Sequence, residues 1–129
     1  MTQSTMVNTK TAPRRELSFH CTGCLKEELA RVEAAHVAGT LTHTGNWTAG
    51  ENLDHIALVW EFAFDGPPPS ARVPLLMRVI GPLMKRWFTS GKTLPAGFKI
   101  PQSAAYMEPR PDVAFEVGLA RLRRVLDRL

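Results

Sequence analysis

The segment from Thr48 to Pro69 constrains the fold more than any other part of the chain. Thr48 and Glu51 have the spacing of a capping box, in which the hydroxyl accepts a backbone N–H and the carboxylate reaches back to the cap residue. The helix that begins there is expected to run to about Phe64, because the prolines at 67–69 cannot continue it. Apolar residues cover nearly its whole circumference, which is typical of a helix packed between others. We therefore expect the central helix of an all-α domain.

A helix is also predicted over residues 24–38, ahead of this central one. Apolar positions recur there at spacings of three and four, with charged residues on the other side. Thr22 is the expected N-cap, because its hydroxyl can accept a free backbone N–H. Gly39 is expected to end the helix.

Two more helices are predicted in the second half of the chain, and no strand is convincing. One covers residues 71–88, with Pro74 in its first turn and a kink or break expected just before Pro82. A long loop rich in glycine and proline covers residues 89–109. The last helix is expected to cover residues 111–129, where a broad apolar stripe accompanies several arginines.

Chain length predicts one domain, because 129 residues can build one real core but not two ordinary domains. Residues 1–13 have no apolar period and are expected to form a disordered tail, which leaves residues 14–129 as the folded domain. The tail lacks the apolar region of a signal peptide. The longest apolar run, residues 73–84, is interrupted by an arginine and two prolines, so it cannot span a bilayer. These features indicate a cytoplasmic protein with reduced cysteines.

The positive charge is unevenly placed. Formal net charge is +4, and the stretch between Gly66 and Met107 contains basic residues but no Asp or Glu. The basic residues are Arg72, Arg78, Lys85, Arg86, Lys92 and Lys99. Such a stretch is either a solvated face without a dedicated partner or a surface that attracts anions. An anionic small molecule carrying a carboxylate or phosphate is the favoured partner, and nucleic acid is less favoured because no known binding module surrounds the charges.

His55 is the candidate metal ligand of the predicted central helix. One ring nitrogen of a histidine can bind a metal, although a histidine on an apolar helix is more often a hydrogen-bonded core residue. A catalytic zinc site needs about three protein ligands. The other histidines, His20, His36 and His43, form no HxxH or HxxxH pair with His55.

Cys21 and Cys24 form a CxxC motif at an expected helix start. A helix N-terminus lowers the pKa of a thiol, so redox or metal chemistry is physically possible there. The motif lacks the preceding strand typical of thioredoxin-like proteins and lacks a second CxxC for structural zinc. Two incidental thiols near a helix cap therefore remain the simpler interpretation.

Residues 45–57, with the pattern GNWTxGxxLxHIA, resemble the second-helix signature of the DinB/YfiT-like superfamily of metal-dependent enzymes. The narrower resemblance is to a bacterial branch of that superfamily that is known as a domain of unknown function. Further matching stretches are RRELxF at 14–19, FDG at 64–66, GPLxKR at 81–86 and PAGFKIP at 95–101. The resemblance therefore extends over roughly residues 14–129.

This resemblance implies a four-helix bundle, often dimeric, with a metal site of three histidines. His55 matches the first histidine, whereas the histidine pair of the family's final helix has no counterpart. Residues 111–129 resemble the helix that precedes that pair. We therefore expect an all-α, DinB/YfiT-like four-helix bundle that lacks its last helix. The implied cofactor is a divalent metal, zinc or nickel, for which two of the three family ligands are not found.

Two functions follow as hypotheses from the resemblance. The first is a metal-dependent transferase or hydrolase with an incomplete histidine site, in which His55 is one ligand. The second is a non-catalytic helical bundle that acts as a binding or oligomerisation module. The sequence leaves open which applies, and thus whether the protein is an enzyme. A missing helix would expose apolar stripes on its neighbours, so a homo-oligomer is expected.

Overall fold

The computed structural model describes residues 6–71, 75–92, 97, 99–100 and 102–129. These residues form α-helices and one short 3-10 helix, and they contain no strand, so the expected all-α class is confirmed. The helices are α1 (Thr22–Val37), α2 (Ala49–Asp65), α3 (Leu75–Phe88), η1 (Gln102–Met107) and α4 (Phe115–Leu126).

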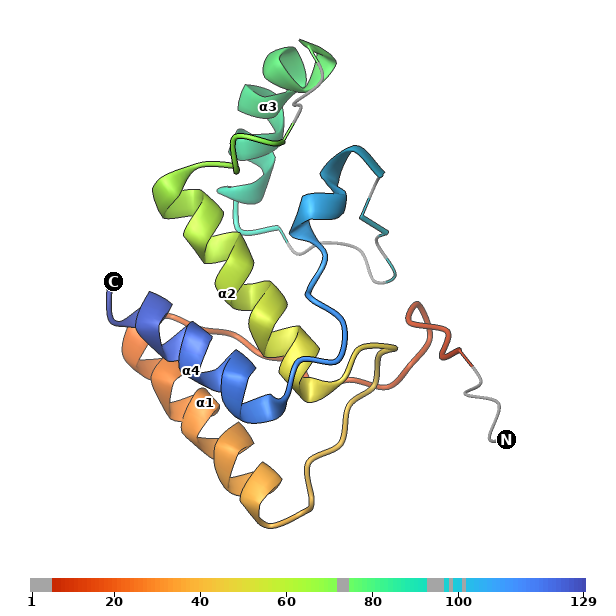
Figure 1. Ribbon diagram of the computed structural model, residues 1–129, viewed down its shortest axis with the longest axis vertical. Coiled ribbons are helices and arrows are strands. Elements are labelled where there is room, and N and C mark those ends of the chain that lie inside the picture. Colours follow the sequence, from red (N-terminus) through yellow and green to blue (C-terminus); the bar gives the residue numbers. More distant parts are fainter. Residues whose placement is uncertain (1–5, 72–74, 93–96, 98, 101) are drawn as a thin grey trace.

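The hydrophobic core is built from residues of α1, α2 and α4. Figure 1 shows how these three helices are arranged. Most of its buried side chains come from α4, where apolar residues recur at the three- and four-residue spacings of one helix face. The buried hydrophobic residues are Leu29, Leu53, Ala57, Phe115, Leu119, Leu122, Val125 and Leu126. An ion pair of Glu33 with Arg123 and a contact of His36 with Glu116 join α1 to α4 at the surface.

Two glycines allow α2 and α4 to approach closely. Gly50 and Gly118 are both buried, and a Cβ atom at Gly118 would lie 2.5 Å from the backbone oxygen of Gly50. A Cβ atom at Gly50 would in turn overlap the backbone oxygen of Val113. Glycine is needed at both positions because no side chain fits between the two backbones.

The predicted boundaries of α2 are confirmed. The backbone N–H of Glu51 donates to Thr48 Oγ1 at 3.2 Å, and the backbone N–H of Thr48 donates to Glu51 Oε2 at 2.8 Å. The helix ends at Asp65, and Gly66 follows with a φ of 80°, a conformation that favours glycine. The position of His55 within α2 is therefore fixed by a cap at each end.

The start of α1 differs by one residue from the prediction. Cys21, not Thr22, is the N-cap, and its sulfur accepts the backbone N–H of Cys24 at 3.2 Å. At the other end Gly39 has a φ of 69°, which agrees with its predicted role in ending the helix.

The third helix is continuous through Pro82, so of the expected kink or break the break does not occur. Pro74 lies outside the described residues. Figure 1 shows α3 beyond the end of α2, away from α1 and α4. Its apolar residues Leu75, Val79 and Leu83 are 76%, 73% and 71% exposed and lie four residues apart, which places them on one face. An apolar face of α3 is therefore open to solvent in this monomer.

The region before α4 is more structured than the predicted loop. It contains η1, and α4 begins at Phe115 rather than near residue 111. Residues near the N-terminus also contact the rest of the protein, because Val7 exchanges two hydrogen bonds with the side chain of Asn46. Within the described residues, every helix is too short or too polar to cross a membrane.

Candidate functional site

His55 is held in one orientation by two neighbours. Its Nδ1 lies 2.7 Å from the carbonyl oxygen of Met107, at the end of η1. Its ring packs against that of Trp47, with the ring centroids 4.9 Å apart. A carbonyl oxygen can only accept a hydrogen bond, so Nδ1 carries the proton in this contact. In the neutral ring the lone pair is then on Nε2, the atom that would bind a metal.

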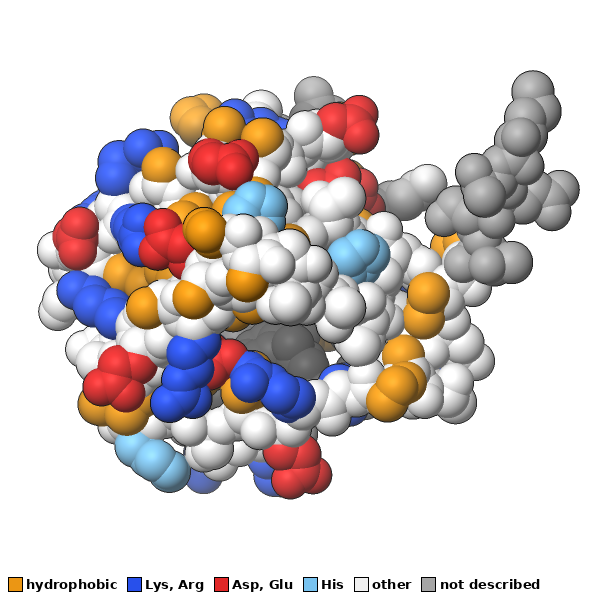
Figure 2. Space-filling model, turned by 90° about the horizontal axis from the view of Figure 1, so that it is seen from below, with side chains coloured by type: hydrophobic (Ala, Val, Ile, Leu, Met, Phe, Trp, Pro, Cys, Tyr) orange, Lys and Arg blue, Asp and Glu red, His pale blue; other side chains and the backbone are white. Residues whose placement is uncertain are grey.

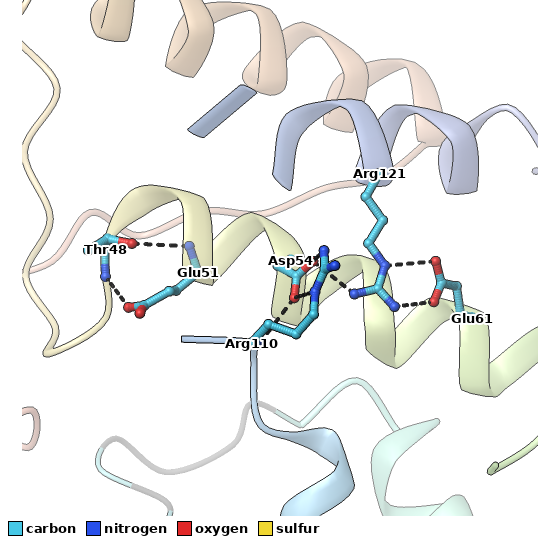
Figure 3. A network of polar contacts seen from close by, with 6 residues as sticks. All are labelled: Thr48, Glu51, Asp54, Glu61, Arg110 and Arg121. Carbon is cyan, nitrogen blue, oxygen red and sulfur yellow. Dashed lines mark hydrogen bonds and ion pairs between the residues drawn. The ribbon is translucent and has the colours of Figure 1, made fainter. Parts of the chain in front are cut away.

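Asp54, the residue before His55, is the only fully buried charged side chain among the described residues. Its Oδ1 accepts hydrogen bonds of 2.8 Å from both Arg110 Nη2 and Arg121 Nη1. Its Oδ2 accepts the backbone N–H of Arg110 at 3.3 Å. Figure 3 shows Arg110 reaching Asp54 from the segment after η1, while Arg121 reaches it from α4. One carboxylate thus joins three parts of the fold.

Arg121 is shared between Asp54 and Glu61 of α2 (Figure 3). Its Nε and Nη2 donate to Glu61 at 3.0 and 2.5 Å in a bidentate pair. Its side chain is 17% exposed, less than that of any other arginine that forms an ion pair among the described residues. The positive charges of Arg110 and Arg121 neutralise the negative charges of Asp54 and Glu61. Charge-assisted hydrogen bonds of this geometry are stronger than hydrogen bonds between neutral groups.

The Asp54 network also positions His55 indirectly. Arg110 is three residues from Met107, whose carbonyl oxygen accepts from His55. Asp54 binds both the backbone and the guanidinium of Arg110, so it holds this segment against α2. The residue pattern of α2 singles out His55 but not Asp54. The sequence does contain a signal for Asp54, because it is an acidic residue within a helix that is apolar on nearly all sides.

Asp54 makes folding stability depend on pH. Burial raises its pKa, but the hydrogen bonds from Arg110 and Arg121 outweigh burial and lower the pKa from 3.8 to about 2. A carboxyl group with a depressed pKa stabilises the folded state fully above its unfolded pKa and loses that contribution as pH falls through the folded pKa. We therefore expect urea unfolding to show a loss of roughly 2 kcal/mol between about pH 5 and pH 2. Asp54→Asn should flatten this part of the pH profile. An identical acid transition in the variant would contradict the assignment to Asp54.

A cavity of about 570 Å³ is lined in part by Trp47. Its wall combines the N-terminal segment, the 45–47 loop, the start of α2 and parts of the region before η1. The lining residues are Met6, Thr9, Gly45, Asn46, Trp47, Asn52, Gly97, Lys99, Ile100 and Glu108. Lys99 and Glu108 bring one charge of each sign, so the cavity offers polar contacts without a strong net field.

The basic stretch is not gathered at this cavity. Lys99 alone of its described members lines the wall, whereas Arg78, Lys85 and Arg86 are exposed on α3 and Arg72 lies outside the described residues. On the face seen in Figure 2, the described basic and acidic side chains are mixed rather than collected into a patch of one sign. Lys99 is therefore the one described residue of the basic stretch that an anionic molecule in this cavity would contact.

The described residues do not form a closed metal site. No group of three or more His, Cys, Asp or Glu side chains among them is placed to hold an ion. His36 Nε2 lies 3.2 Å from Glu116, its ring stacks on Phe115, and His43 Nδ1 contacts the carbonyl oxygen of Gly45. His20 is exposed ahead of α1. Among the described residues, His55 is thus a histidine oriented on the central helix, and no set of three ligands surrounds it.

These features define an all-α protein organised around an ion-paired central helix that carries one oriented histidine. More narrowly, the chain belongs to the DUF1569 family, described as a protein of unknown function, whose family model matches residues 11–129. The expected assignment to a domain of unknown function is thereby confirmed. No curated protein and no solved structure matches the chain.

Proposed function

We propose that this protein is a DinB-like, metal-dependent transferase or hydrolase in which His55 is one ligand of a divalent metal, zinc or nickel. The observation that carries the proposal is the 2.7 Å contact between His55 Nδ1 and the carbonyl oxygen of Met107. Metal-binding histidines commonly donate their second ring N–H to a carbonyl or carboxylate, which fixes the ring and its tautomer. The buried Asp54 network supports the proposal further, since it holds the acceptor in place.

The residues present do not by themselves fit a complete catalytic centre. Such a centre needs about three protein ligands, and no group of three is brought together among the described residues. We therefore assign no reaction step to a metal. We propose instead that the remaining ligands come from outside the described set, with a second copy of the chain as the favoured source. Exposed apolar residues on α2 and α3, including Ile56 and Val79, support association between copies.

Metal content tests this proposal directly. Purified protein is loaded with zinc or nickel, desalted and measured by elemental mass spectrometry, with its oligomeric state determined in the same buffer. We expect stoichiometric metal in the wild type and its loss in His55→Ala, because the alanine removes the oriented ligand. His43→Ala is the matched control, since His43 is an exposed loop histidine and should leave the metal content unchanged. Metal-free wild-type protein would contradict the proposal.

The second candidate function is a non-catalytic oligomerisation module, and the open apolar face of α3 favours it. Leu75, Val79 and Leu83 are all more than two-thirds exposed, which is unusual for a contiguous apolar row on a monomer. A metal-free protein that associates with rising concentration, and whose association is abolished by Val79→Glu, would favour this function. Metal binding that depends on His55 would favour the first.

A further inference from the structure

Cys21 and Cys24 are in direct contact at the start of α1. Their sulfur atoms lie 2.8 Å apart, and both thiols are free. Cys21 is exposed, whereas Cys24, in the first turn, is half-buried. A disulfide bond joins sulfurs about 2 Å apart, so a small side-chain movement is enough to close one here. The pair therefore has the geometry of a reversible dithiol with one accessible partner.

The surroundings distinguish the two thiols chemically. Hydrogen bonds from the side chain and the backbone N–H of Cys24 lower the pKa of the Cys21 thiol, and desolvation and the nearby Glu27 carboxylate only partly oppose them. The same side-chain contact and burial raise the pKa of the Cys24 thiol. The thiolate is the nucleophile in sulfur chemistry. Cys21 is therefore the attacking residue and Cys24 the resolving one.

A hollow of about 250 Å³ lies beside Cys24. Leu17 and Phe19 give it an apolar edge, and both are exposed. The remaining lining residues are Glu16, Ser18, Glu27, Glu28 and Arg31. Glu28 is already ion-paired with Arg15 and Arg31. The negative charges of Glu16 and Glu27 remain, and they disfavour an anionic ligand. The hollow beside the pair thus disfavours an anionic disulfide and leaves a small uncharged one as the better substrate.

We propose that Cys21 and Cys24 are a redox-active dithiol that reduces small uncharged disulfides by thiol–disulfide exchange. The Cys21 thiolate attacks one sulfur of the substrate, whose S–S bond breaks and releases one thiolate that takes up a proton. Cys24, after losing its proton to solvent, attacks Sγ of Cys21 in the mixed disulfide and releases the second thiol. Two electrons pass from the protein to the substrate, which leaves a Cys21–Cys24 disulfide and two small thiols. This activity does not involve His55.

Bis(2-hydroxyethyl) disulfide is the probe, because it is small and uncharged. The reduced full-length protein is mixed with it, quenched with acid at intervals, alkylated and weighed by mass spectrometry. We expect the wild type to lose two hydrogen atoms of mass, to become resistant to alkylation and to release two equivalents of 2-mercaptoethanol. Cys24→Ser should instead accumulate a mixed disulfide on Cys21. Cys21→Ser should react several-fold more slowly than Cys24→Ser, because its remaining thiol, Cys24, is half-buried whereas Cys21 is exposed.

Cys21→Ser should keep the helix intact, since serine is a preferred N-cap residue, and far-ultraviolet circular dichroism checks this. The wild-type mass change needs no variant and decides the proposal even if a variant folds poorly. Two independent adducts on the wild type without an internal disulfide would overturn the proposal. Equal reaction rates for the two single variants would also overturn it, because the thiols would then act as unrelated surface cysteines.

Discussion

Replacing Asp54 with alanine is expected to lower the free energy of unfolding by about 3 kcal/mol, the range found when one partner of a buried ion pair is removed. The carboxylate is fully buried and accepts from two guanidinium groups. Its loss leaves Arg121 with Glu61 as its remaining partner and frees Arg110 from α2. Arg110 is more than half exposed, so water can solvate its guanidinium after Asp54 is removed. The loss of stability is therefore expected to stay below that of a fully buried charge without a partner. Urea unfolding followed by circular dichroism measures the loss.

Asp65→Ala is the matched control for this substitution. Asp65 is on the same helix and also forms a bidentate pair with an arginine, Arg128, at 2.7 and 2.8 Å, but both partners are largely exposed. Exposed pairs contribute little, because water and salt screen them. The loss in Asp65→Ala should therefore be clearly smaller than in Asp54→Ala. Equal losses would mean that burial of the Asp54 network adds nothing to stability.

The ends of α2 could be predicted because the signals are local. Thr48 and Glu51 interact only with backbone a few residues away, and the prolines after Asp65 act through their own ring geometry. The start of α4 could not be predicted in the same way. Ala114 is its N-cap without any side-chain hydrogen bond, so the sequence carries no capping signal there. Packing of the apolar face against α2 determines this helix instead.

The candidate site also combines features that the sequence predicts with features that it does not. His55 was predicted from its position on an apolar helix and from the family resemblance. Its acceptor is the backbone oxygen of Met107, 52 residues away, and a carbonyl oxygen has no signature in residue type. The partners of Asp54 are 56 and 67 residues away, on segments whose approach to α2 depends on the whole core. Residue pattern alone therefore singles out His55 as a candidate but does not reveal the contacts that orient it.

The N-cap of α1 illustrates a third case. Thr22 has the residue type that capping rules favour, yet Cys21 occupies the position. Its sulfur can accept the backbone N–H of Cys24 while also contacting the Cys24 thiol. The second contact is available only from the position of Cys21. The N-cap is thus one residue earlier than predicted, and in this position the Cys21 sulfur contacts the Cys24 thiol.

Gly118→Ala is expected to destabilise the protein by at least about 2 kcal/mol, although alanine normally favours a helix over glycine by up to about 1 kcal/mol. The new Cβ would lie 2.5 Å from Gly50 O, 3.1 Å from Leu53 Cβ and 3.3 Å from the backbone nitrogen of Asp54. A backbone oxygen cannot move aside as a flexible side chain can, so α2 and α4 must separate. Separation opens the core and lengthens the Asp54–Arg121 contact together. Urea unfolding and the thermal midpoint measure the combined loss.

Gly23→Ala provides the matched control, because Gly23 is also in a helix but its added Cβ would have only an ordinary 3.6 Å contact with Cys21 Sγ. Helix propensity should then dominate, and stability should stay the same or rise by a few tenths of a kcal/mol. Opposite signs for the same chemical change would identify the backbone contact between α2 and α4 as the cause. If Gly118→Ala were as stable as the wild type, the close approach of the two helices would not be required for this fold.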